Sequence, residues 1–192
     1  MLFSTKGRTL LNLKSKGFNV PKLILIKKKN FVKYPDKIID QIYNEFSQLI
    51  AIRSSAGNED SNNESLAGKY QSFLNINPKN KKLVRDCLNR ISSDFDNKFK
   101  NEIIIQNMVN KSVVSGVCTT VDLHNYLPII NINYDETDKT DTVTSGKKNS
   151  HTLTIFDDKV KKIKNKKIFN FIKEVKKLKS KLISWFPKVS LN

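Results

Sequence analysis

The sequence predicts an α+β fold, and two observations carry this prediction. Four segments space their apolar residues three and four apart, as amphipathic helices do. Short apolar runs lie between these segments, and three of the runs follow one another with only turns between them, which is typical of antiparallel strands. The chain has 192 residues, of which 38% are hydrophobic, so it can form one or two compact units with a core.

The chain begins with a predicted helix and strand. Gly17 suits the position just after a helix end, and Pro21 opens an extended run over 23–26 that we expect to be a buried strand. The apolar face of this first helix consists of Leu10, Leu11, Leu13 and Phe18. A second helix is predicted over 35–49, beginning at Pro35 and Asp36. Its apolar stripe consists of Ile38, Ile39, Ile42, Phe46 and Leu49.

Residues 50–76 predict a hairpin with a long tip. An apolar strand at 49–56 and another at 70–76 flank a polar loop over 57–68. A helix over 79–99 follows. Its stripe consists of Leu83, Cys87, Leu88, Ile91 and Phe95.

The second half predicts strands and then a basic helix. The strands are expected at 103–109, 113–121, 127–133 and 151–156. From Lys159 onward the chain is rich in lysine. A helical stripe opposite these lysines consists of Ile168, Ile172, Val175, Leu178 and Leu182.

The formal net charge of +17 indicates attraction to anions. Arginine is nearly absent, whereas proteins that read nucleic acids favour its bidentate fork, so we expect a solvated lysine surface rather than a nucleic-acid partner. No run approaches the roughly 20 apolar residues of a membrane span. Two cysteines are too few for a disulfide framework, and a cytoplasmic location is expected. His124 and His151 lack partners at metal or triad spacing and are interpreted as structural.

Residues 53–76 carry a pattern suited to phosphate binding. Arg53 stands at the end of a strand, two serines and a glycine-bearing loop follow, and Gly68 and Ser72 begin the next strand. Small residues let backbone N–H groups approach an anion, and an arginine can clamp phosphate oxygens. A polar hairpin with a flexible tip explains the same residues without any ligand.

This stretch resembles the nucleotide-binding domain of phosphoenolpyruvate synthase, pyruvate phosphate dikinase and rifampicin phosphotransferase. The resemblance spans residues 4–146 and is carried by four collinear motifs. They are Arg53-Ser54-Ser55-Ala56 with Ser65 to Ile76, Lys6-Gly7-Arg8 with Gly17 to Pro21, Ile105 to Val109 with Ser115 to Thr120, and Asn133 to Gly146.

The resemblance implies an ATP-grasp-type fold that binds ATP and Mg²⁺ for a kinase or transferase reaction. Lys6 and Arg53 would neutralise the phosphates, and loop 57–68 would close over them with Gly68 and Ser72 at its base. Gln106, Met108 and Val109 would line the adenine pocket, where an edge strand would offer backbone groups to the purine. Glu59 and Asp60 either contact magnesium or lie at a solvated loop tip.

The family's phosphohistidine and substrate domains have no counterpart in this sequence. We therefore expect an ATP-binding region over 1–156, no catalytic residues, and a lysine-rich helix and tail over 157–192. That last part resembles the start of a further helix–strand unit, so the ATP-grasp domain is expected to be incomplete at its C-terminus. Most Mg²⁺ ligands would then lie outside this chain, and a second chain would complete the enzyme. A basic module for nucleic acid or membranes and an inactive remnant are the alternatives.

Overall fold

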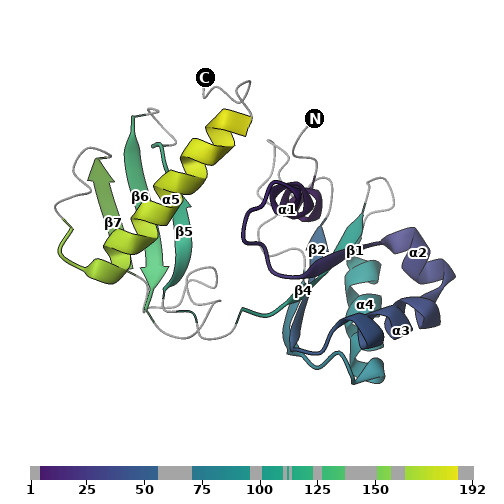
Figure 1. Cartoon of the computed structure of the whole chain (residues 1–192). Coiled ribbons are helices and arrows are strands. Elements are labelled where there is room, and N and C mark those ends of the chain that lie inside the picture. Colours follow the sequence, from purple (N-terminus) through teal and green to yellow (C-terminus); the bar gives the residue numbers. More distant parts are fainter. Residues whose placement is uncertain are drawn as a thin grey trace. The chain divides into compact units, whose positions relative to one another are not determined.

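The computed structural model describes residues 5–55, 71–95, 101–109, 112, 114–122, 127–136, 151–156 and 163–185. The chain divides into two compact units, Met1–Met108 (unit 1) and Val109–Asn192 (unit 2), and each is described by itself (Figure 1). Strand pairs within the described residues are antiparallel in both units. The α+β class is therefore confirmed.

Unit 1 contains a four-stranded sheet with the strand order β1-β4-β2-β3. Its strands are β1 (Leu23–Lys27), β2 (Ile50–Ser55), β3 (Ser72–Ile76) and β4 (Glu102–Asn107). β2 and β3 pair with each other as the predicted hairpin. β4 lies between β1 and β2, so the last strand of the unit occupies the middle of the sheet.

Four helices accompany this sheet: α1 (Lys6–Ser15), α2 (Lys28–Lys33), α3 (Pro35–Glu45) and α4 (Lys81–Asp94). The short helix α2 was not predicted. The expected role of Gly17 is confirmed, because its φ of 76° lets the chain turn after α1. Phe18 N donates to Leu13 O at 3.1 Å across this turn and satisfies a carbonyl at the helix end.

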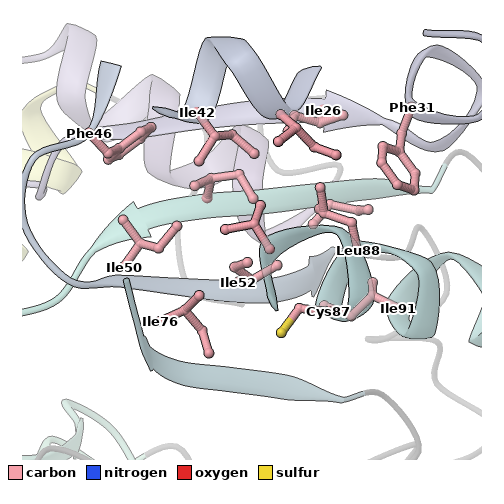
Figure 2. Close-up of a cluster of buried hydrophobic side chains, with 14 of the residues drawn as sticks. Ile26, Phe31, Ile42, Phe46, Ile50, Ile52, Ile76, Cys87, Leu88 and Ile91 are labelled. Carbon is pink, nitrogen blue, oxygen red and sulfur yellow. The ribbon is translucent and has the colours of Figure 1, made fainter. Parts of the chain in front are cut away.

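The main core of unit 1 lies on one side of the sheet, which we call the core face. There the side chains of α2, α3 and α4 meet alternate residues of the strands, as Figure 2 shows. The strands contribute Ile26, Ile50, Ile52, Ile76, Ile103 and Ile105, and the helices contribute Phe31, Ile39, Ile42, Val84, Cys87, Leu88 and Ile91. The alternation along each strand means that its other residues face the opposite side of the sheet.

The apolar stripes predicted for α3 and α4 each include a leucine that is not buried. Leu49 and Leu83 are 41% and 39% exposed and lie outside the core. Helix α3 ends at Glu45 because Phe46 adopts an extended backbone, which still leaves the Phe46 side chain buried. Leu49 therefore belongs to the segment between α3 and β2, while Leu83 lies on the solvent side of α4.

Unit 2 contains a three-stranded sheet, β5-β6-β7, and the helix α5 (Lys166–Trp185). The strands are β5 (Ser115–Thr119), β6 (Ile129–Asp135) and β7 (His151–Phe156). Its core joins Ile130 and Ile132 of β6 to Ile168 and Ile172 of α5, while Leu178 is 42% exposed. The first part of the predicted stripe on α5 is therefore buried, and its lysines lie on other faces. In the part of the chain that the structure describes, no helix is both long enough and apolar enough to cross a bilayer.

Candidate functional site

The side of the unit 1 sheet opposite the core face is covered in part by helix α1, and we call it the α1 face. Strand register aligns four residues in one row across it: Leu25 of β1, Ile104 of β4, Arg53 of β2 and Ser72 of β3. In the neighbouring rows Ser55 pairs with Glu102, and Ala51 pairs with Gln106. Polar residues from the predicted motifs of β2, β3 and β4 thus share one face of the sheet.

Helix α1 rests on this row through Gly7. A Cβ atom added at Gly7 would overlap Leu25 Cδ2 and lie 3.2 Å from Ile104 Cγ1, so a larger residue would not fit in the same position. Gly7 N also donates a hydrogen bond of 2.9 Å to Ser55 Oγ, which is fully buried. The Lys-Gly motif at the start of the chain and the Arg-Ser-Ser motif of β2 are therefore in direct contact.

Helix α1 begins at Lys6, on the same face of the sheet as Arg53. Lys6 is the first residue of α1 and directly precedes Gly7, which contacts Ile104. Arg53 is the cross-strand neighbour of Ile104, about one strand spacing of 4.8 Å away. The side chains of Lys6 and Arg53 are both exposed. Two cations from segments far apart in the sequence thus belong to the same region of the α1 face.

A β-bulge places Ser72 on the α1 face as well. Ser72 pairs with Arg53, and Phe73 pairs with Ile52, but the next register pair joins Ile76 to Ile50. One extra residue of β3 is therefore accommodated, and Asn75 adopts a φ of 57° there. Ser72 is exposed, as its predicted role requires.

Gln106 and Met108, two of the predicted adenine residues, lie at the end of β4. Gln106 is the cross-strand partner of Ala51 and of Leu23, and it is partly buried on the α1 face. Met108, just after the strand, is partly buried, and Val109 is 51% exposed. Val109 is the first residue of unit 2.

The expectation that the strand carrying Gln106 is an edge strand is wrong. β4 pairs with β1 on one side and with β2 on the other. Asn107 N donates to Lys22 O at 2.9 Å, and Met108 N donates to Leu49 O at 2.8 Å. Neighbouring segments thus occupy the backbone donors up to Met108, and any backbone contact with a purine would have to use other groups.

Gly68, Glu59 and Asp60 lie outside the described residues, as does His124. His151 is exposed on β7, with its ring 5.4 Å from the ring of Tyr134. Within the described ranges, no three His, Cys, Asp or Glu side chains gather in a way that could hold a metal ion.

Sequence reasoning missed a buried carboxylate on the α1 face. Glu102 Oε2 accepts a hydrogen bond from Thr5 Oγ1 at 3.2 Å, and Glu102 Oε1 lies 2.6 Å from Arg8 Nη2. Thr5 also caps α1, because Thr5 Oγ1 accepts from Arg8 N at 3.3 Å. A threonine just before a predicted helix is a recognisable cap signal, whereas no local pattern marks Glu102 as buried.

Comparison with protein-family models gives a match that covers most of the chain. The family model described as the pyruvate phosphate dikinase AMP/ATP-binding domain matches residues 8–181. The match includes all the predicted site positions except Lys6, and it continues past residue 156, where we expected the ATP-binding region to end. A search of curated proteins found no match. Because the family model covers most of the 192 residues, the chain belongs to the family of the pyruvate phosphate dikinase AMP/ATP-binding domain.

Proposed function

We propose that this chain is the ATP-binding portion of a phosphoenolpyruvate-synthase-like phosphotransferase with an ATP-grasp-type architecture. The single observation that carries the proposal is the hydrogen bond between Gly7 N and Ser55 Oγ. It joins the Lys6 motif to the Arg53 motif on one face of the sheet. Family membership supports ATP as the ligand, and this contact supports the α1 face as the place where its phosphates bind.

The charge pattern of α1 favours an anion at its first turn. A helix N-terminus carries a partial positive charge, so cations there cost about 0.3–1 kcal/mol each. The first turn of α1 nevertheless contains Lys6 and Arg8 and no acidic residue. Glu102 compensates Arg8. A phosphate near Lys6 and Arg53 would lie at the positive end of the helix and accept hydrogen bonds from both side chains.

In this proposal the other predicted residues surround the same nucleotide. Gly68 and Ser72 would contact the phosphates at the base of loop 57–68, and Gln106, Met108 and Val109 would contact the adenine. Charge clamps of this kind provide most of what proteins contribute to phosphoryl transfer. The histidine that accepts the phosphoryl group would come from another domain or a second chain. A cytoplasmic location goes with this proposal, since Cys87 and Cys118 are free thiols.

An ATP titration of the full chain, with Arg53→Ala as the variant, tests the proposal. Losing a charge-assisted clamp of about 1.5–3 kcal/mol should weaken binding by about 10- to 100-fold. Arg90→Ala is the matched control, because Arg90 is exposed on α4, on the opposite side of the sheet. It removes the same charge and should leave the affinity nearly unchanged. Equal affinities of wild type and Arg53→Ala for ATP would eliminate the proposed site.

The basic helix α5 supports a second candidate, binding of a nucleic acid or an anionic membrane. Lys166, Lys173 and Lys177 are exposed on the side of α5 opposite the buried Ile168 and Ile172. This candidate predicts an affinity for DNA or anionic vesicles that falls steeply with salt and depends on these lysines. It leaves the contact between the Lys6 and Arg53 motifs unexplained, and we therefore rank it below ATP binding.

A further inference from the structure

We infer that Glu102 is a positioning residue for Lys6. By holding the first turn of α1 through Thr5 and Arg8, Glu102 determines where the Lys6 ammonium group lies on the α1 face. The inference rests on the proposed function, because the role of Lys6 at the phosphates of ATP is what makes its position matter.

The contacts of Glu102 are those of a fixed anchor. Its side chain is only 4% exposed, and each carboxylate oxygen has a different partner at the start of α1: Arg8 Nη2 of the first turn for Oε1 and Oγ1 of the cap residue Thr5 for Oε2. A buried carboxylate is costly without such partners. Thr5 and Arg8 are three residues apart and flank Lys6, so the two contacts fix both position and rotation of the first turn.

The backbone of Lys6 is held from both sides. Thr5 is bound to Glu102, and Gly7 is bound to Ser55. Ser55 and Glu102 are themselves directly opposite each other in the pairing of β2 with β4. One row of the sheet therefore holds the residues before and after Lys6, and the neighbouring row contains Arg53. This arrangement fixes Lys6 relative to Arg53 without any direct contact between Glu102 and a nucleotide.

Electrostatics and positioning predict opposite effects of removing this carboxylate. Glu102 is an anion on the face where we place phosphates, so its long-range charge alone disfavours ATP. If charge dominated, Glu102→Ala would bind ATP more tightly than wild type. If Glu102 acts through Lys6, the same substitution releases the first turn of α1, and ATP binds more weakly.

A double-mutant cycle in the full chain tests the inference. ATP dissociation constants are measured by calorimetry for wild type, Glu102→Ala, Lys6→Ala and the double variant, with Arg53→Ala as the reference. Circular dichroism checks the fold of each protein. We expect Glu102→Ala to weaken binding about 5- to 10-fold in the presence of Lys6 and to have almost no effect in the Lys6→Ala background. Glu102→Gln, which keeps an oxygen acceptor, should restore most of the affinity.

Tighter ATP binding by Glu102→Ala, or an equal loss with and without Lys6, would overturn the inference. A normal affinity of Arg53→Ala would instead overturn the proposed ATP site, so the two failures are distinguishable. If Glu102→Ala does not fold, Thr5→Val replaces it, because it removes the hydrogen bond to Glu102 Oε2 with little change in shape. The same comparison with and without Lys6 then decides the outcome.

Discussion

Replacing Gly7 by alanine should separate helix α1 from the sheet beneath it. The new Cβ atom would lie closer than 3.0 Å to Leu25 Cδ2 and 3.2 Å from both Leu25 Cδ1 and Ile104 Cγ1. Because both methyl groups of Leu25 are close, rotating that side chain relieves one contact at the expense of the other. Ile104 is buried and cannot move away easily. Either the Leu25 side chain or the first turn of α1 must therefore shift.

The magnitude follows from three effects. Overpacking costs about 1–3 kcal/mol. A shift of α1 also stretches the 2.9 Å hydrogen bond from Gly7 N to the buried Ser55 Oγ, and a weakened hydrogen bond costs about 0.5–1.5 kcal/mol. Against these, alanine is favoured over glycine inside a helix by up to about 1 kcal/mol. We expect a net loss of about 1–3 kcal/mol in the free energy of unfolding and a weaker affinity for ATP.

Urea unfolding followed by far-ultraviolet circular dichroism measures this loss, and ATP calorimetry measures the functional effect. Gly17→Asn is the control. Gly17 has a φ of 76° and no atom within 4 Å of an added Cβ, and asparagine tolerates this backbone conformation. Its stability should stay within about 0.5 kcal/mol of wild type. A Gly7→Ala protein as stable as wild type, with unchanged ATP affinity, would refute the steric argument.

Two further predictions concern other parts of the chain. Gly116→Ala should destabilise unit 2 by at least about 2 kcal/mol, because the added atom would overlap the backbone of β6 at Asn133 and Tyr134, which side-chain rotation cannot relieve. Urea unfolding followed by circular dichroism should show the lower urea midpoint of unit 2, whereas replacing the exposed Val117 by alanine should change that midpoint little. Burial raises the pKa of both the Cys87 and the Cys118 thiol. At pH 8 both should therefore be alkylated more slowly than glutathione, with rates that increase as the pH rises, and rapid labelling of the native protein would contradict this.

The periodicity of the sequence identified nearly all of the described strands and longer helices. It was wrong about the face that α1 buries, because Gly7 is the buried residue of α1 and Leu11 of the predicted apolar face is 38% exposed. It missed α2 because six residues with one buried side chain, Phe31, give no repeat to detect. It assigned Leu49 and Leu83 to buried stripes because spacing does not reveal where a helix ends or which flank faces water. The periodicity also did not predict that β4 lies between β1 and β2, because a pattern of apolar residues does not specify which strands are neighbours in a sheet.

The site was predictable only in part. The motifs identified Arg53 and Ser72, and the structure puts both on the α1 face beside the first turn of α1. The contact between Glu102 and Arg8 joins residues that are 94 positions apart, so no local pattern could reveal it. The role of Ser55 as the acceptor for Gly7 N likewise depends on how α1 lies against the sheet.

The β-bulge in β3 lets this short strand place Ser72 on the exposed α1 face and Ile76 in the core. Residues four apart on a regular strand point to the same side, so an uninterrupted β3 would send Ser72 and Ile76 in the same direction. Either a hydroxyl would enter the isoleucine cluster or an isoleucine would meet water. The extra residue at the bulge moves the residues after it to the other face, so Ser72 and Ile76 point to opposite sides of the sheet. The left-handed backbone at Asn75 suits asparagine or glycine. Deleting Asn75 would therefore turn either Ser72 or Ile76 to the wrong face of the sheet, although every residue before position 75 would be unchanged.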